Sequence, residues 1–316
     1  MEMVPIVPRG YCYGVVDALV LVQRVAQDPT VPRPIYVLGM IVHNRHVVES
    51  LASLGVQTLD GPNRSELLDS IGVGTVIFTA HGVAPDVRHR AIAKGLHVVD
   101  ATCPDVTRTH DLIREKVANG YTVLYIGRGG HPEPEGAMGV VPPERVYLVE
   151  REEDVEGLVL PEGPILVTNQ TTMSQWDTQK LVDSILERYP EAEVHNEICL
   201  ATQQRQEAVA QQAVGLDLVL VVGDERSNNA NRLVQVAREC AGVDAYRVAD
   251  LHEIDIKWLL PCQRVGVTAG ASTPTSLTRE VMAFVSQFSA QDPTTWEAKI
   301  AEGDRRLLPR IRPLTS

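Results

Sequence analysis

This chain of 316 residues has few aromatic residues, and it has fewer basic than acidic residues. Aromatics make up 4% of it, so Val, Leu, Ile and Ala have to build the core. The formal net charge of −12 argues against nucleic acid and against a polybasic membrane anchor, because both require a basic face. A small anionic substrate is still compatible, since imidazoles and backbone N–H groups can oppose the overall sign locally.

Long apolar runs and a regular cysteine framework are also absent. No stretch approaches the roughly 18 apolar residues of a membrane span. The first residues contain Glu2 and two early prolines and do not resemble a signal peptide. The five cysteines, an odd number at wide spacing, argue against a disulfide framework. We therefore expect a cytoplasmic protein without a membrane partner.

Three of the cysteines indicate an internal repeat. Cys12, Cys103 and Cys199 each follow a strand-like run, and each opens a segment with apolar residues at helical spacing. A short β-branched run that ends in glycine comes next in each unit: IYVLG, TVLYIG and LVLVVG. Two further strand-like runs complete each unit, and the last of them ends in a polar tip.

Alternating strands and helices predict parallel sheets with right-handed crossovers. We expect an α/β fold of three pseudo-repeated lobes, each a small, mostly parallel sheet flanked by helices. The predicted lobes are residues 1–99, 100–196 and 197–289, followed by a C-terminal tail at 290–316. Ligands of such sheets bind beyond the carboxyl ends of the strands, where the polar tips lie.

The three repeated cysteines are candidate metal ligands. A single free cysteine is most often a small buried hydrophobe, and we interpret Cys240 and Cys262 in that way. Cys12, Cys103 and Cys199 instead share one place in the repeat, at a helix start that favours the thiolate. Three thiolates suit zinc or an iron–sulfur cluster, and either would keep one metal position open for a substrate.

Three histidines share the strand-end position, and the remaining histidines have the ordinary surface or core interpretation. His43 and His131 follow the glycine that ends a strand, and His81 lies in a polar tip. As hydrogen-bond donors they suit phosphate or hydroxyl oxygens, and an anionic site would raise their pKa. They are therefore candidate ligands of an anionic substrate.

The segment GRGGHPEPEG resembles a phosphate loop but lacks the G-x-G-x-x-G spacing. Pro132 and Pro134 are expected to interrupt any helix and to place His131 and Glu133 together on a loop. A carboxyl group whose pKa is raised by burial or by negative neighbours can donate a proton. Glu133 is the candidate, whereas Glu135 is interpreted as a solvated acid.

Small polar residues at two strand ends form a candidate cradle for a diphosphate. They lie in RSNNAN and TAGAS, for which ordinary turn chemistry is the alternative interpretation. Beside the histidines we favour a cradle of Ser and Asn side chains with exposed backbone N–H groups. The candidates are Ser227, Asn228, Asn229 and Ser272.

These motifs resemble the LytB/IspH family of 4-hydroxy-3-methylbut-2-enyl diphosphate reductases. The similarity runs from about residue 5 to about residue 285 and is carried by PRGYCYGV, TAHG, DATCP, GHPE, NQTT, RQEA, SNN and TAGAS. The resemblance implies a trefoil of three α/β lobes around an iron–sulfur cluster. It also implies the last step of the non-mevalonate isoprenoid pathway, a two-electron, two-proton removal of an allylic hydroxyl that gives isopentenyl and dimethylallyl diphosphates.

The resemblance further implies a role for each candidate residue. Cys12, Cys103 and Cys199 would hold three irons of a [4Fe–4S] cluster, and the fourth iron would meet the substrate hydroxyl. Glu133 would take part in proton delivery, with His131 and Thr171 near the reacting hydroxyl. The diphosphate would be held by His43, His81, Ser227, Asn228, Asn229 and Ser272.

One departure and two alternatives accompany the resemblance. Asn228 stands where the family has a second serine, although an amide can still donate to phosphate. No flavin or nicotinamide motif occurs in the sequence, so electrons are expected from a separate ferredoxin or flavodoxin. The residues alone leave open a zinc hydrolase or lyase built on the three cysteines, or a non-enzymatic α/β protein that binds phosphorylated metabolites.

Overall fold

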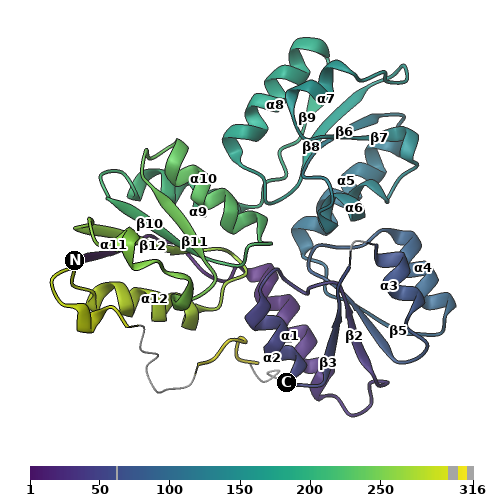
Figure 1. The fold of residues 1–316 in the computed structure, drawn as a ribbon. Helices are drawn as coiled ribbons and strands as arrows, with labels where there is room; N and C mark the ends of the chain where they lie inside the picture. Colours follow the sequence, from purple (N-terminus) through teal and green to yellow (C-terminus); the bar gives the residue numbers. More distant parts are fainter. Residues whose placement is uncertain (62, 298–304, 312–316) are drawn as a thin grey trace. The chain divides into compact units, whose positions relative to one another are not determined.

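The computed structural model describes residues 1–61, 63–297 and 305–311. Within them the strands form three parallel sheets of four strands each, with helices between the strands (Figure 1). The predicted fold class, α/β with small parallel sheets flanked by helices, is confirmed. Over the same residues, no helix is both long and apolar enough to cross a lipid bilayer.

The first sheet has the strand order β3-β2-β4-β5, and all neighbouring strands are parallel. Its strands are β2 (Ile35–Leu38), β3 (Val56–Leu59), β4 (Thr75–Phe78) and β5 (His97–Asp100). The helices of this part of the chain are α1 (Tyr13–Gln27), α2 (Arg45–Ala52), α3 (Arg64–Asp69) and α4 (Pro85–Ala93).

The second sheet repeats this order as β7-β6-β8-β9. Its strands are β6 (Thr122–Ile126), β7 (Val146–Val149), β8 (Ile165–Asn169) and β9 (Glu193–Val194). The accompanying helices are α5 (Pro104–Ala118), α6 (Pro132–Met138), the 3₁₀ helix η1 (Pro143–Arg145), α7 (Glu152–Glu156) and α8 (Gln175–Arg188).

The third sheet, with the order β1-β12-β10-β11, shows the same pattern read from its other edge. Its strands are β1 (Glu2–Pro5), β10 (Leu218–Val222), β11 (Ala245–Val248) and β12 (Arg264–Ala269). The helices here are α9 (Leu200–Gln212), α10 (Asn228–Glu239), η2 (Leu251–Glu253), α11 (Ile256–Leu259), α12 (Thr275–Gln287) and η3 (Pro293–Thr295).

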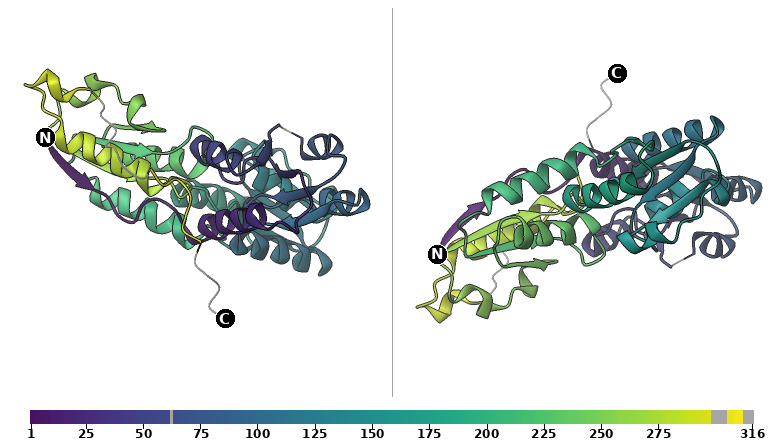
Figure 2. Two further views of the ribbon diagram at one scale, coloured as in Figure 1. Left: turned by 90° about the horizontal axis from the view of Figure 1, so that it is seen from below. Right: turned by 90° about the horizontal axis from the view of Figure 1, so that it is seen from above.

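The N-terminal strand β1 completes the third sheet rather than the first. It pairs in parallel with β12, with Met3 opposite Val265, and Ile6 just beyond it is buried in the core of this sheet. In Figure 2 the purple arrow of β1 lies among the green and yellow elements of the third sheet. The predicted ranges 1–99 and 197–289 place this strand differently, because sequence order does not show that the chain start covers the edge of β12.

Alternate residues of β10 pack into two apolar clusters on opposite faces of the third sheet. One cluster includes α12, and the other includes α9 and α10, which lie on the other side of the strands in Figure 1. This alternation has the period of two that strands impose, and burial of both faces explains why the strand appears as an unbroken apolar run. The first cluster contains Leu218, Leu220 and Val222, and the second contains Val219 and Val221.

Contacts divide the chain into two compact units. The third-sheet unit contains Met1–Tyr13, His43–Ser50 and Leu200–Arg310. The two-sheet unit, which holds the first and second sheets, contains Gly14–Val42 and Leu51–Cys199. The short segment His43–Ser50 therefore packs with the third sheet, although the sequence on both sides of it belongs to the two-sheet unit.

The described part of the tail up to Arg310 belongs to the third-sheet unit. Arg305 forms an ion pair with Glu280 of α12 at 2.8 Å. Tyr11 donates its hydroxyl hydrogen to the carbonyl of Leu307 at 2.6 Å. Of the predicted tail at 290–316, positions 298–304 and 312–316 lie outside the described residues.

Candidate functional site

Each of the three repeated cysteines lies between an edge strand of a sheet and the start of a helix. The edge strands are β1, β5 and β9. Cys12 precedes α1, Cys103 is the N-cap of α5, and Cys199 precedes α9. The backbone N–H of each cysteine donates to a carbonyl in the turn after the strand that pairs with this edge strand, namely β12, β4 or β8. The acceptors are Ala271 at 3.2 Å for Cys12, Ala80 at 3.0 Å for Cys103 and Thr171 at 3.0 Å for Cys199. The internal repeat therefore extends to individual hydrogen bonds.

The three thiols have the chemistry of a soft-metal site. None of the three forms a disulfide, and all three are half-buried rather than sealed in the core. Thiolate sulfur is a preferred ligand of zinc and of iron–sulfur clusters, and the donor set fits either. Cys103 and Cys199 belong to the two-sheet unit, and Cys12 belongs to the third-sheet unit.

Gly14, in the first turn of α1, packs against the sulfur of Cys103. A Cβ at this position would overlap Cys103 Sγ and lie 3.3 Å from its Cβ. We expect Gly14→Ala to turn the thiol away without unfolding the protein, so that the metal bound per chain falls. Gly72→Ala is the matched control, because in the described part of the chain nothing lies within 4 Å of a Cβ there. Equal metal content in the two variants would contradict the prediction.

Glu133 is a buried carboxyl group at the start of α6. The residue is 2% exposed, and Oε1 accepts the backbone N–H of Thr171 at 2.7 Å. Burial raises the pKa of this carboxyl to about 7, against the opposing effect of its hydrogen bonds to Thr171. A group with this pKa gains and loses a proton near neutral pH, as a general acid must. The second carboxylate of the segment, Glu135, is exposed.

The raised pKa of Glu133 makes the stability of the fold depend on pH. The folded state holds this proton more tightly than the unfolded chain, in which the pKa is 4.5. The stabilising contribution is therefore complete below about pH 4.5 and is lost as the pH rises through about 7. From about pH 5 to about pH 8, the free energy of unfolding should fall more in the unchanged protein than in Glu133→Gln, by at most about 3 kcal/mol. Parallel pH profiles in thermal unfolding would contradict this.

The prediction that Pro132 and Pro134 interrupt any helix is wrong. Both lie in the first turn of α6, where the missing backbone N–H has no partner within the helix to lose. His131 is the N-cap, and its Nδ1 accepts the backbone N–H of Glu133 at 3.2 Å. A helix start, rather than a loop, therefore fixes His131 beside Glu133.

Gln170 holds the ring of His131. Its side-chain nitrogen donates to His131 Nδ1 at 3.1 Å, and its Oε1 accepts the backbone N–H of Arg128 at 3.0 Å. The bond to Arg128 determines which end of the amide is nitrogen. Nδ1 therefore acts as an acceptor, and in the neutral ring the proton lies on Nε2.

His81 lies in the turn after β4 and meets His131 edge-on, with ring centroids 5.3 Å apart. The hydroxyl oxygen of Thr79 lies 3.4 Å from His81 Nδ1 and 3.5 Å from a guanidinium nitrogen of Arg64. Arg64 is buried, and burial lowers its pKa, yet a guanidinium stays charged at neutral pH. A buried cation behind His81 favours an anion at the two imidazoles.

Two serines at the carboxyl end of the third sheet contact each other, and one of them also contacts His43. Ser227, after β10, is the N-cap of α10, and its Oγ accepts the backbone N–H of Ala230 at 3.2 Å. Ser272, after β12, donates to the carbonyl of His43 at 3.0 Å, and its Oγ lies 3.4 Å from Ser227 Oγ. These bonds place His43 at the strand ends of the third sheet.

Asn228 and Asn229 form the first turn of α10, and both are buried. Asn229 Oδ1 accepts the backbone N–H of Ala271 at 3.0 Å, and its Nδ2 lies 3.4 Å from the hydroxyl of Thr202. Asn229 thereby ties α10 to the turn that accepts the N–H of Cys12. The first-turn N–H groups of a helix have no acceptor within the helix, which suits them to an anion.

The structure brings the predicted site residues together in two groups, one in each unit. The third-sheet unit holds Cys12, His43, Ser227, Asn228, Asn229 and Ser272. The two-sheet unit holds His81, Cys103, His131, Glu133, Thr171 and Cys199. The first group combines one thiol, and the second two thiols, with hydrogen-bonding groups suited to phosphate or hydroxyl oxygens.

Three residues of these groups are missing from the sequence-based prediction. Gln170 lies inside the NQTT motif and Gly14 inside PRGYCYGV, so both motifs contained a signal. Arg64 had none, because it reaches Thr79 only through the folding of α3 onto β2 and β4.

Sequence comparisons relate this chain to known proteins. The family model described as LytB protein matches residues 4–286. A 4-hydroxy-3-methylbut-2-enyl diphosphate reductase of Brevibacillus brevis is 61% identical over 99% of this chain and 100% of its own length. A protein of the same name from a Geobacillus species is 58% identical over 99% of both chains.

Two solved structures share the fold. The E-1-hydroxy-2-methyl-but-2-enyl-4-diphosphate reductase of Plasmodium falciparum has a TM-score of 0.83 and 31% identity, covering 89% of this chain and 87% of its own. An (E)-4-hydroxy-3-methyl-but-2-enyl diphosphate reductase, described as the terminal enzyme of the non-mevalonate pathway, has a TM-score of 0.64 and 30% identity, covering 91% and 100%. Since the family match spans most of its length, the chain belongs to the LytB family.

Proposed function

We propose that this protein is an iron–sulfur reductase that converts 4-hydroxy-3-methylbut-2-enyl diphosphate to isopentenyl and dimethylallyl diphosphates. The reaction removes the allylic hydroxyl with two electrons and two protons and is the last step of the non-mevalonate isoprenoid pathway. Two relatives that match 99% of this chain are named 4-hydroxy-3-methylbut-2-enyl diphosphate reductase, and a solved relative is described as the terminal enzyme of the non-mevalonate pathway.

The observation that carries the proposal is a pair of hydrogen bonds at Thr171. Its backbone N–H donates to Glu133, and its carbonyl accepts the backbone N–H of Cys199. One residue therefore connects a carboxyl group with a pKa of about 7 to the backbone of Cys199, a candidate metal ligand. A proton donor connected in this way to a candidate soft-metal ligand suits the reductive loss of a hydroxyl.

The proposed metal centre is a [4Fe–4S] cluster held by Cys12, Cys103 and Cys199. Three protein ligands leave one metal position for the substrate oxygen. When bound, such a cluster would pass electrons from the external donor to the substrate and would offer a Lewis-acid position for the hydroxyl. The backbone hydrogen bonds of the three cysteines fix the backbone positions from which the thiol side chains extend.

The two-sheet unit would supply protons to the departing hydroxyl. Glu133 would give up its proton near neutral pH, and its carboxylate would then be protonated again from solvent. His131 offers Nε2–H as a donor, since its Nδ1 is occupied by Gln170 and by the backbone of Glu133. Thr171 orients the carboxyl group of Glu133 through its N–H and lies beside the reacting hydroxyl.

The diphosphate would be bound by donors from both groups of residues. His43 and His81 contribute imidazoles, with the charge of Arg64 behind His81. The third-sheet unit contributes hydroxyl and amide groups at the start of α10 and in the turn after β12. These donors are Ser227, Asn228, Asn229 and Ser272.

Two further parts of the proposal concern the cell. Since the sequence has no flavin or nicotinamide motif, the electrons would come from a separate ferredoxin or flavodoxin. The absence of a membrane-spanning helix among the described residues agrees with a cytoplasmic location, which we also propose.

Anaerobic purification followed by iron, sulfide and zinc analysis tests this function. We expect iron with acid-labile sulfide, a paramagnetic resonance signal after reduction, and turnover of the allylic diphosphate with a chemical reductant. Stoichiometric zinc without sulfide would contradict the proposal and would favour a hydrolase or lyase instead.

A further inference from the structure

We infer that Asp224 is a positioning residue that joins the two loops carrying the proposed diphosphate ligands His43 and Ser227. The inference rests on the proposed function for the identity of the anion. Its basis is a buried carboxylate in the loop between β10 and α10, outside the predicted site residues.

The two oxygens of Asp224 are bound to different loops. Oδ2 accepts the backbone N–H of Arg45, two residues after His43, at 2.9 Å. Oδ1 accepts the backbone N–H of Arg226, directly before Ser227, at 3.0 Å. An ionised carboxylate can accept several bonds at once, so a single side chain fixes the backbone of both loops.

Arg45 is the first residue of α2. Asp224, from a distant part of the sequence, caps this helix by accepting the backbone N–H of Arg45. The first N–H groups of a helix have no acceptor within it, and the helix dipole favours a negative charge there. Asn44 accepts the N–H of Val47 at 3.2 Å and covers a second group. The carboxylate thus stabilises the helix start that immediately follows His43.

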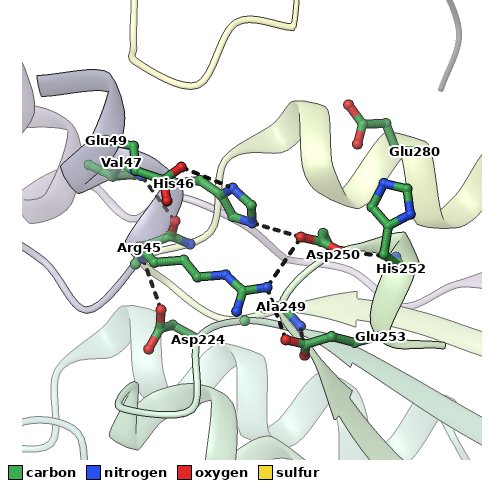
Figure 3. A network of polar contacts seen from close by, with 12 residues as sticks. Arg45, His46, Val47, Glu49, Asp224, Ala249, Asp250, His252, Glu253 and Glu280 are labelled. Carbon is green, nitrogen blue, oxygen red and sulfur yellow. Dashed lines mark hydrogen bonds and ion pairs between the residues drawn. The ribbon is translucent and has the colours of Figure 1, made fainter. Parts of the chain in front are cut away.

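The side chains at the start of α2 hold the same segment from a second direction. In Figure 3, Arg45 and His46 both point toward Asp250 in the loop after β11. The guanidinium of Arg45 lies 3.3 Å from Asp250 and 2.9 Å from Glu253, and His46 Nε2 lies 2.9 Å from Asp250. The His43–Ser50 segment is therefore fastened to the third sheet at several points.

Asp224 differs from Asp250 and Glu253 in the segments that it connects. Asp250 and Glu253 also accept backbone N–H groups, but these come from His252 and Ala249 in their own loop. Asp224 instead binds the backbone of the residue before the proposed ligand Ser227. A negative charge near an anion site opposes binding of the anion, so a compensating benefit is expected. Asp224 provides one by ordering the two ligand loops before the anion arrives, because ordering them during binding would lower affinity.

The test uses the full chain with its cluster and compares Asp224→Ala with the unchanged protein. We expect KM for the allylic diphosphate and Kd for inorganic pyrophosphate to rise about tenfold, which is the lower range for losing charge-assisted hydrogen bonds. The value of kcat and the iron content should change little. Asp224→Asn keeps one accepting oxygen and should give an intermediate KM.

Asp217→Ala is the matched control. Asp217 also accepts two backbone N–H groups in the third-sheet unit, from Gln263 at 2.7 Å and Arg264 at 2.8 Å. It lies before β10, at the opposite end of the strand from Asp224. Its loss should lower the unfolding temperature without changing KM or pyrophosphate affinity.

Two results would overturn the inference. One is unchanged KM and pyrophosphate affinity in Asp224→Ala, and the other is an equal change in both alanine variants, which would indicate general destabilisation. Failure of the proposed function is distinguishable, because the unchanged protein would then not turn over the allylic diphosphate. Pyrophosphate affinity would still test the role of Asp224, and the absence of pyrophosphate binding by the unchanged protein would overturn the inference.

Discussion

Replacing Glu133 by Gln is expected to lower kcat by roughly 10²–10⁴-fold, the range for loss of a general acid. The amide has nearly the same shape and keeps an oxygen for the N–H of Thr171, so the site should retain its geometry. It has no acidic proton to give to the departing hydroxyl. Steady-state turnover under anaerobic conditions measures the loss, and iron content together with pyrophosphate binding should match those of the unchanged protein.

Glu135→Gln provides the control for this experiment. It removes a carboxylate from the same helix, two residues farther along, but from an exposed position. Turnover should stay close to that of the unchanged protein. Normal turnover in Glu133→Gln would show that the proposed proton donor is wrong, and equal losses in both variants would indicate an effect of charge on the helix rather than of a specific proton.

Replacing Cys103 by Ser is expected to remove the metal centre and, with it, turnover. Serine has nearly the size of cysteine, so the N-cap of α5 and its backbone bond to Ala80 should persist. A neutral hydroxyl is a poor ligand where a soft thiolate is preferred. Changes to residues that only support a ligand already cost about 10–100-fold in metal affinity, and losing a ligand should cost at least as much.

Iron and acid-labile sulfide per chain are the measurements for Cys103→Ser, and circular dichroism verifies the fold. Cys240→Ser is the control, because this exposed cysteine is the C-cap of α10 and lies outside the repeated set. It should leave iron content and turnover unchanged. Full iron content in Cys103→Ser would refute its assignment as a ligand.

The strands and long helices follow from local sequence patterns. The run LVLVVG forms β10, and the amphipathic segment after Cys103 forms α5. Such patterns can be interpreted locally because side chains repeat every two residues in a strand and every 3.6 in a helix. The start of α6 was predicted wrongly, since Pro132 and Pro134 are favourable in a first turn and unfavourable beyond it.

The candidate site shows the same division between local and distant information. The repeat identified Cys12, Cys103 and Cys199, and the structure gives all three an equivalent backbone bond. The supporting residues Arg64 and Asp224 gave no such signal. Each acts on a segment distant in sequence, so its role depends on which loops the sheets bring together.

The α/β class, the threefold repeat and the chemical types at the strand ends can be predicted from the amino-acid sequence. These properties depend on the order and spacing of residues along the chain. The tertiary structure alone decided that β1 completes the third sheet, that His43 packs with that sheet, and that Asp224 joins two ligand loops. It also decided that the pKa of Glu133 is about 7, because burial and hydrogen bonds depend on neighbours that only folding brings together.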